Sequence, residues 1–396
     1  MGKSLAVNAG SSTLKFKLFQ MPEEKVLAEG AVDRIGMGHS QVEVKYGDGQ
    51  KYEATDEVPD HEKAIQLMLA ALTDLHIIDD FNEITGVGHR IVAGGQEFKD
   101  SAIIDDDVLK KIEDLAEYAP LHNPAAALGI RAFKKILPGV LSVAVFDTSF
   151  HTTMPKVNYM YAIPYEYYEK FGARKYGAHG TSHRYVANRA AELLGKPLSE
   201  LKLVTLHLGA GASITAIKDG KSYDTSMGFT PLAGIEMATR SGDIDASLVA
   251  FLMEKLNITD PEDMINILNK KSGLMGVSGV SGDMRDLESV QDENPRAKLA
   301  LDMFVNRVVR YVGSYLAELG GADAIVFTAG IGENDSWIRQ RVVDRLSYFG
   351  LAIDPDKNNV RGVERDLSTD DAKIKTFLIP TDEELMIVRD IERLRK

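Results

Sequence analysis

Three glycine-rich turns follow apolar, strand-like stretches of this chain, at residues 8–13, 209–213 and 329–334. Glycine lets backbone N–H groups come close to a phosphate because no side chain stands in the way. One such turn is most often only a turn, but three in one chain favour a nucleotide site. None fits the P-loop pattern or the G-x-G-x-x-G pattern within a β-α-β unit, which disfavours both of those phosphate-binding folds.

Short polar clusters supply side chains that could bind an anion or a metal ion. The cluster at residues 147–149 ends a buried apolar run, where ligand-facing residues commonly lie in open α/β sheets. Taken singly, each cluster is equally compatible with a structural role, such as a helix cap or a surface ion pair. The clusters are His89-Arg90, His122-Asn123-Pro124, Asp147-Thr148-Ser149, His179-Gly180-Thr181-Ser182-His183 and Thr239-Arg240-Ser241-Gly242-Asp243.

Strand-like and helix-like stretches alternate along the chain, which predicts an α/β fold with mixed sheets. Gly47-Asp48-Gly49 predicts a hairpin between strands at 41–46 and 51–54. In the first half the other predicted elements are strands at 3–7, 14–18, 84–88 and 140–146 and helices near 60–75 and 105–118.

The second half repeats the strand, small turn, strand pattern of the N-terminus. Strands are predicted at 203–208 and 214–217 around the second glycine turn, and a Ser lies near the start of the returning strand in both halves. This likeness suggests an internal duplication. The remaining predicted elements are strands at 324–328 and 374–379 and helices at 295–319, from about 336 and from 382.

The composition limits the classes of function. The chain has 396 residues, which indicates two or three domains, and a formal net charge of −13. Such an acidic surface repels nucleic acid, so an anionic substrate must be met by local basic groups. The absence of Cys excludes disulfides and thiolate chemistry and fits a reducing compartment. With no apolar run of about 18 residues and no signal peptide, we expect a soluble cytoplasmic protein and no membrane partner.

Several motifs together resemble those of the acetate kinases. Residues 7–15, Val-Asn-Ala-Gly-Ser-Ser-Thr-Leu-Lys, resemble the first signature of that family, and residues 207–215, His-Leu-Gly-Ala-Gly-Ala-Ser-Ile-Thr, its second. The likeness continues, in order along the chain, through residues 88–90, 120–124, 146–151, 176–183, 226–232, 279–285, 327–334 and 381–385.

The resemblance implies the α/β fold of the sugar kinase, actin and heat-shock ATPase superfamily, which is ribonuclease H-like. Two similar domains then flank an active-site cleft that holds the nucleotide. It places one domain at residues 1–147 with the C-terminal helix, about 383–396, and the nucleotide-binding domain at 148–382. Members of the family are typically homodimers.

The reaction that the resemblance implies is Mg²⁺-dependent, reversible transfer of the ATP γ-phosphoryl group to acetate, which gives ADP and acetyl phosphate. Mn²⁺ is an expected substitute for Mg²⁺. Acetate is ionised at neutral pH, so the site needs positive charge and hydrogen-bond donors more than a strong base. The matching catalytic residues are Arg90, His122, Asp147, His179 and Arg240; we expect Asp147 to orient an arginine or a metal-bound water and not to remove a proton.

The resemblance also assigns ligand contacts. Arg90 is expected to bind the acetate carboxylate, and Val92, Leu121 and Pro231 to line the pocket for its methyl group. Asn8 and Glu383 match the magnesium site, and Ser11 and Thr13 match phosphate contacts. The matching nucleotide-binding residues are Lys15, His207, Leu208, Gly209, Ala210, Gly211, Asp283, Met284, Arg285, Gly330, Ile331, Gly332, Glu333 and Asn334.

The chain departs from the usual family pattern without losing a charged catalytic group. Ala210 and Ala212 replace an Asn and a Ser of the second signature, which removes a hydrogen bond on the phosphate side. The other departures are Thr13, Ala93, Ala178 and Asp382. They leave two alternatives open: a propionate or butyrate kinase of the same fold, and a nucleotide-binding paralogue without catalysis.

Overall fold

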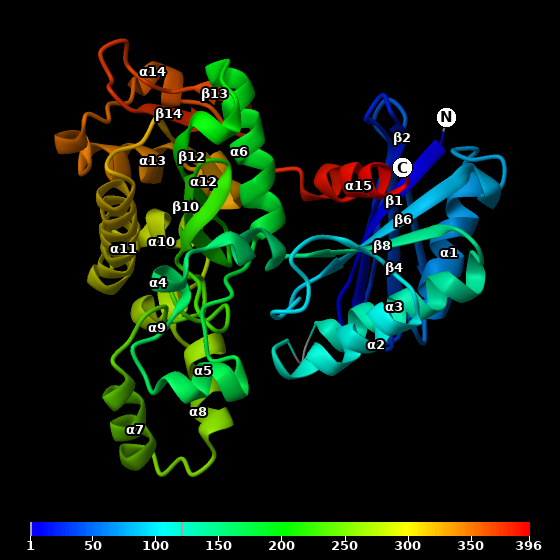
Figure 1. Cartoon of the computed structure of the whole chain (residues 1–396), viewed down its shortest axis with the longest axis horizontal. Coiled ribbons are helices and arrows are strands. Elements are labelled where there is room, and N and C mark those ends of the chain that lie inside the picture. Colours follow the sequence, from blue (N-terminus) through cyan, green and yellow to red (C-terminus); the bar gives the residue numbers. More distant parts are fainter. Residues whose placement is uncertain (1, 120–121) are drawn as a thin grey trace. The chain divides into compact units, whose positions relative to one another are not determined.

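The computed structural model of the chain describes residues 2–119 and 122–396. It contains two compact units, Met1–Phe150 with Asp382–Lys396 and His151–Thr381. Each unit is built on one mixed sheet covered by helices, which confirms the predicted α/β class (Figure 1). No helix in the described ranges is both long enough and apolar enough to cross a bilayer.

The sheet of the first unit has the strand order β5-β4-β3-β2-β1-β6-β8-β7. Strands β1, β6 and β8 are parallel, and the other pairs are antiparallel. The strands are β1 (Gly2–Ala9), β2 (Thr13–Met21), β3 (Lys25–Asp33), β4 (Ser40–Tyr46), β5 (Gln50–Asp56), β6 (Ile84–Ile91), β7 (Ala102–Ile103) and β8 (Leu141–Phe146).

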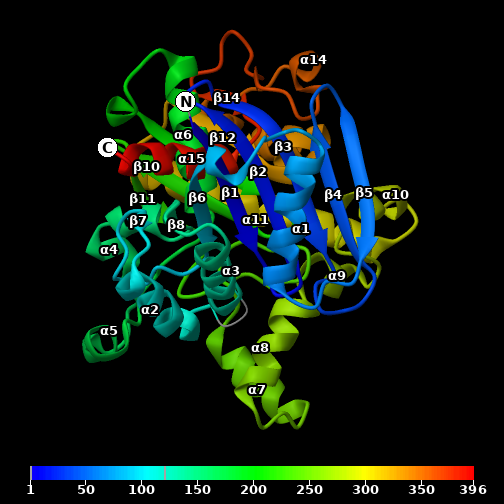
Figure 2. The ribbon, with the colours of Figure 1, turned by 90° about the vertical axis from the view of Figure 1, so that its right-hand side faces the viewer.

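Helices cover both faces of this sheet (Figure 2). One face packs its apolar side chains against α1 (His61–Asp74) and α3 (Asn123–Ile136), and α2 (Asp106–Asp114) lies beside α3. The other face packs against α15 (Glu383–Leu394). Glycine is required at Gly88, because a Cβ there would lie 2.2 Å from Ile387 Cγ2 of α15. This close approach sets the start of α15 above the carboxyl end of β6.

The sheet of the second unit repeats the connectivity of the first. Its order is β11-β10-β9-β12-β14-β13, and β9, β12 and β14 are parallel. The strands β9, β10, β11, β12, β14 and β13 therefore correspond to β1, β2, β3, β6, β8 and β7. The strands are β9 (Lys202–Leu208), β10 (Ala212–Lys218), β11 (Lys221–Thr225), β12 (Ala324–Thr328), β13 (Arg365–Asp366) and β14 (Lys375–Leu378).

The helices of the second unit surround a separate core. The long helix α11 (Pro295–Leu319) packs one apolar face against the sheet, with Phe304 and Val308 fully buried. Asn294 caps its first turn and Gly320 ends it in a left-handed conformation. The other helices are α4 (Lys156–Tyr159), α5 (Tyr165–Phe171), α6 (Gly180–Leu194), α7 (Ala246–Lys255), α8 (Pro261–Lys270), α9 (Gly273–Ser278), α10 (Met284–Val290), α12 (Ala329–Asn334), α13 (Ser336–Asp344) and α14 (Pro355–Asn358).

Two local predictions need correction. His89 and Arg90 lie inside β6, not after it, because that strand continues to pair with β8 as far as Ile91. The third glycine-rich segment is the short helix α12 and not an open turn. In it Ala329, and neither glycine, has the left-handed backbone conformation, with φ of 63°.

Candidate active site

An ion pair between a buried carboxylate and a half-buried guanidinium lies at the carboxyl edge of the first sheet. Arg90 is near the end of β6, and Asp147 directly follows the neighbouring parallel strand β8. Arg90 Nη2 donates to Asp147 Oδ2 at 2.7 Å, and Arg90 Nε donates to Asp147 Oδ1 at 3.1 Å. The charge of the Asp147 carboxylate raises the pKa of Arg90. The guanidinium is therefore held in a fixed orientation and is fully charged.

A second carboxyl group faces the same guanidinium. Glu383, in the first turn of α15, places Oε2 3.9 Å from Arg90 Nε. Burial, and the charges of Asp147, Glu384 and Asp382, raise the pKa of Glu383 to about 7, against the opposing effect of Arg90. The carboxyl groups at this point therefore outnumber the single positive charge of Arg90. Such a site suits a hard divalent cation, whose charge relieves repulsion among the carboxylates.

The first glycine turn lies at the same edge. Asn8, near the end of β1, is paired directly with Lys15 on β2, so that both side chains lie on one face of the sheet. Gly10 N donates to the Thr13 carbonyl at 2.8 Å and closes the turn that carries Ser11. Lys15 is exposed, and it lines a hollow with Glu384, which follows Glu383 on α15.

The loop after β6 is held by Asn123, a member of the predicted polar cluster at residues 122–124. Buried Asn123, the first residue of α3, accepts from Ala93 N at 3.1 Å and donates to the Ala93 carbonyl at 3.0 Å. This clamp fixes Val92, which is half-buried. His122 is exposed at the start of α3, and the predicted pocket residue Leu121 is outside the described part of the chain.

In the second unit the two other glycine segments lie next to each other. They follow the parallel strands β9 and β12, in which His207 is paired with Thr328. A Cβ on Gly209 would lie 3.9 Å from Gly330 N, so the backbones of the two segments are neighbours. Ala210 and Gly330 are exposed. The two segments therefore form one surface on which backbone groups can approach a phosphate.

His179 and Arg240 meet beside this surface. A Cβ on Gly211 would lie 3.6 Å from both His179 Nε2 and Arg240 Nη1. Arg240 Nη1 donates to the Pro231 carbonyl at 3.3 Å, which brings a third predicted residue to the same place. Burial lowers the pKa of Arg240. Within the described ranges, no carboxylate lies within ion-pair distance of its guanidinium. This charge is thus left for an external anion.

Comparison with known proteins gives one consistent result. The Acetokinase family profile matches residues 3–389. The chain is 67% identical to the acetate kinase of Lactiplantibacillus plantarum over 100% of this chain and 99% of the relative, and 55% identical to that of Bacillus subtilis, with 100% of both covered.

The chain belongs to the acetokinase family.

Solved structures agree with this assignment. The Porphyromonas gingivalis acetate kinase has a TM-score of 0.96 at 43% identity over 100% of both chains. A propionate kinase from Francisella tularensis has a TM-score of 0.92 at 40% identity, covering 98% of this chain and 99% of that one. The α/β fold implied by the resemblance to the acetate kinases is thereby confirmed. Membership of the acetokinase family makes this protein a kinase that uses ATP and a divalent metal ion.

In each unit the structure brings most of the predicted site residues of that unit close together. The roles of these residues stay predictions. Asp283 caps α10 and pairs with the exposed Arg285, and Met284 is buried beneath them. Glu288 lies further along α10, and burial together with the neighbouring Asp335 carboxyl raises the pKa of Glu288 to about 8. Leu208 is buried, and Ile331 packs on the core.

Two side chains hold the segment from Gly330 to Asn334 in place. Arg339 was not predicted from the sequence, and Glu333 was predicted only as a nucleotide contact. Buried Arg339 donates from Nη1 to the Gly332 carbonyl at 2.9 Å, and burial lowers its pKa to about 10. Glu333 Oε1 accepts from Ala329 N at 2.8 Å and from Thr381 N at 3.0 Å. No sequence motif pointed to Arg339, because it lies within the amphipathic helix α13, nine residues after Gly330.

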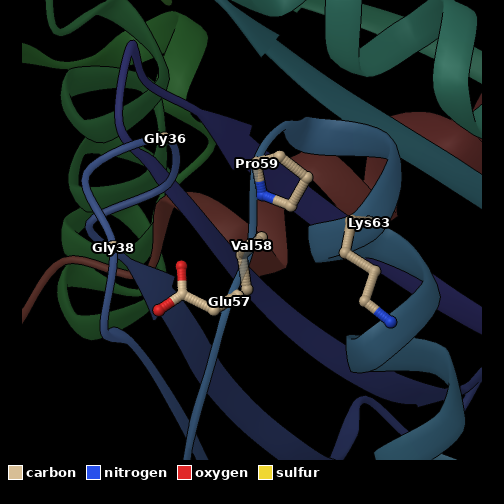
Figure 3. A pocket seen from close by; sticks show the side chains of 6 residues that line it. All are labelled: Gly36, Gly38, Glu57, Val58, Pro59 and Lys63. Carbon is tan, nitrogen blue, oxygen red and sulfur yellow. The ribbon is translucent and has the colours of Figure 1, made fainter.

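One further hollow contains none of the predicted site residues. It opens beside the loop that joins β3 to β4 and beside the start of α1, as Figure 3 shows. Its lining residues are Gly36, Gly38, Glu57, Val58, Pro59 and Lys63. We assign no ligand to it.

Proposed function

We propose that this chain catalyses the reversible, Mg²⁺-dependent transfer of the γ-phosphoryl group of ATP to acetate, in one direct in-line step. The observation that carries this proposal is the uncompensated guanidinium of Arg240 beside His179 Nε2. A planar cation and a ring N–H donor suit the equatorial oxygens of a phosphoryl group in transfer. The identity of 67% to a named acetate kinase supports acetate as the acceptor.

Acetate needs no base to become a nucleophile. A carboxylic acid with a pKa of roughly 4 to 5 is already ionised at neutral pH. The difficulty is to bring one anion onto another, and fixed positive charge reduces it. We therefore assign binding of the acetate carboxylate to Arg90. Asp147, held in a two-point contact with that guanidinium, keeps it oriented and removes no proton.

The metal site is proposed at the acidic end of α15. Glu383 lies among acidic neighbours, with a raised pKa, and Asn8 offers a neutral oxygen at the end of β1. These are the oxygen ligands that Mg²⁺ accepts while it keeps several of its waters, and Mn²⁺ accepts them too. The bound ion would neutralise charge on the ATP phosphates. Lys15, opposite Asn8 on the neighbouring strand, would add a positive charge for the phosphates. Ser11 and Thr13 would add hydroxyl groups that can donate to them.

The nucleotide is assigned to the adjoining segments 207–211 and 330–334, with 283–285 at the start of α10. Their neighbouring backbones support this assignment. Val92 and Pro231 are assigned to the methyl group of acetate, together with Leu121. We further propose a homodimer in the cytoplasm, an oligomeric state that sedimentation at micromolar concentration would test.

The test is ADP release by the purified protein with ATP, Mg²⁺ and acetate, read through a coupled assay. We expect turnover that requires both acetate and the metal ion. Absence of that turnover, with ATP binding intact, would support the non-catalytic alternative. The likeness to a propionate kinase makes chain length the second comparison. A pocket distinguishes one methylene by only about 1–3 kcal/mol, so propionate should be a poorer substrate, and a higher kcat/KM for propionate would reverse the assignment.

A further inference from the structure

Behind His179 lies a row of buried hydrogen-bonding side chains that the reaction as described does not use. It runs through α6, β9 and β10. His179 Nδ1 is 2.8 Å from Ser213 Oγ, and Ser213 Oγ is also 2.8 Å from His183 Nε2. His183 Nδ1 is in turn 2.7 Å from Thr205 Oγ1. Ser213, His183 and Thr205 each have 0% of their surface exposed.

The strand pattern explains how these polar groups come together. Side chains alternate between the two faces of a strand, so Thr205 and His207 share one face of β9. Ser213 is paired with His207 in the β9–β10 hairpin and therefore lies on that face as well. Helix α6 packs on β9 and carries His183 to the same place. The polar face of the hairpin is thus buried under α6, where each polar group needs a partner.

His179 itself is held in an unusual conformation. It precedes α6 with φ of 57°, in the left-handed region that non-glycine residues seldom occupy. Its ring stacks on that of His207, with centroids 4.1 Å apart and planes at 21°. Such backbone geometry persists where surrounding contacts fix it, and it often marks a functional position. Ser213 and His207 supply those contacts from the edge and the face of the ring.

The hydrogens in this row have a restricted arrangement. Burial lowers the pKa of His183 well below its ordinary value, so its ring is neutral, with one nitrogen donating and the other accepting. A serine hydroxyl has one hydrogen and two lone pairs, so Ser213 can donate to only one of the two rings and accepts from at least the other. If Thr205 donates to His183 Nδ1, then His183 Nε2–H donates to Ser213, and Ser213 donates to His179 Nδ1. In this order His179 carries its hydrogen on Nε2, the atom that faces Arg240 across Gly211.

We propose that Ser213, supported by His183, is a positioning residue that holds His179 in the Nε2–H form, with that N–H ready to donate to the transferring phosphoryl group. The inference rests on the proposed function, because it deepens the role assigned to His179. In the opposite order a neutral His179 would present a bare lone pair at Nε2 and repel phosphoryl oxygens. The hydroxyl of Ser213 therefore acts on the reaction only through the imidazole.

The experiment compares Ser213→Ala with Ser222→Ala. Ser222 is a matched control because it is buried, and its Oγ lies 2.8 Å from a histidine nitrogen, His151 Nδ1. We expect S213A to lower kcat by about tenfold or more, since a misplaced donor loses much of what a fixed donor contributes to a charged transition state. The KM values for ATP and acetate should change by less than about threefold. S222A should keep wild-type kcat, and S213T, which restores the hydroxyl, should recover most of the loss.

Two further measurements separate positioning from general structural support. In a His179→Ala background, S213A should cause no additional loss of kcat, because its only route to the reaction is gone. Nitrogen-15 NMR of the histidines should show His179 with its hydrogen on Nε2 in the wild type and a mixture of both neutral forms in S213A.

The outcomes distinguish this inference from the proposed function. If H179A loses activity while S213A keeps the wild-type kcat, the positioning role is wrong and the proposed function stands. Equal losses in S213A and S222A would mean that the row only supports the fold, which also overturns the inference. If H179A itself turns over normally, the role of His179 fails, and the role of Ser213 fails with it.

Discussion

The two units place their key arginines in opposite electrostatic surroundings. In the first unit Arg90 is bound at two points by Asp147 and approached by Glu383. In the second unit Arg240 donates to a backbone carbonyl and has a neighbouring imidazole. The first surroundings have an excess of negative charge, and the second an excess of positive charge. The two sheets share the same connectivity, but their sites differ. The first site suits a metal cation and the carboxylate of the substrate, and the second suits an anionic phosphoryl group.

The largest effect is expected from Arg240→Ala. It removes a guanidinium whose charge nothing else in its described surroundings offsets, so kcat should fall by about a thousandfold or more. The Arg240→Lys variant should recover part of the rate, because it restores the charge without the planar fork. Steady-state kinetics in both reaction directions measure this.

Arg189→Ala is the matched control. Arg189 is in the same unit, but Glu364 already pairs with it at 2.6 Å and 2.8 Å. The R189A substitution should leave kcat within about twofold of wild type, because it removes no charge on which the substrate depends. Near-normal turnover by R240A would refute the contrast between the two arginines.

A smaller effect is expected from Asp147→Asn. If Asp147 only orients Arg90, its loss misplaces the bound acetate and lowers kcat/KM for acetate by about tenfold to a hundredfold. Arg90→Ala should cost more than this. The pH profile of D147N should keep the shape of the wild-type profile. A lost limb of that profile, with a larger penalty than in R90A, would instead assign Asp147 the transfer of a proton.

A buried carboxyl group in the second unit makes the stability of the fold depend on pH. Glu236 in the second unit is 2% exposed, both its carboxyl oxygens lack a hydrogen-bond partner, and burial raises its pKa to about 7. The folded state therefore keeps a proton that the unfolded state releases above pH of about 4.5. Stability from this group falls as pH rises from about 4.5 to 7, and the loss is complete above that window.

Glu236→Gln tests this directly. The free energy of unfolding of E236Q should match that of the wild type near pH 4 and exceed it by about 3 kcal/mol at pH 8. Urea unfolding at the two pH values measures the difference. Glu254→Gln, on the exposed side of α7, is the control and should show no such pH dependence. A constant difference between E236Q and wild type at both pH values would contradict the buried, protonated carboxyl.

The smallest effect is expected from Ala210→Asn in the exposed second glycine turn. The added amide offers a hydrogen bond on the phosphate side, so KM for ATP should fall by about two- to fivefold with kcat nearly unchanged. An unchanged KM would mean that Ala210 is neutral for nucleotide binding.

Much of the fold could be predicted from local patterns. The hairpin around Gly47-Asp48-Gly49 and the helix Pro295–Leu319 are as predicted, because turn residues, caps and apolar spacing are local signals. Strand β3, at Lys25–Asp33, was not predicted, because its burial alternates only weakly. Helix α12 was missed because glycine disfavours helices, and long-range contacts from Arg339 and Thr381 fix it instead.

The site divides in the same way. Arg90, Asp147 and Arg240 could be singled out because they stand in short motifs. Ser213 and His183 could not be connected from the sequence, because they lie 30 residues apart and only the packing of α6 on the β9–β10 hairpin brings them together. Residues that orient a reacting group are chosen by the fold around it, and no spacing rule reveals them.

The most direct test of the central claim is a crystal structure of the protein with ADP, Mg²⁺, acetate and a planar fluoride mimic of the phosphoryl group. We predict that the Arg240 guanidinium and His179 Nε2 lie at hydrogen-bond distance, about 3 Å, from the fluorides of the mimic. A mimic bound with ADP but contacted by neither of these groups would contradict the account.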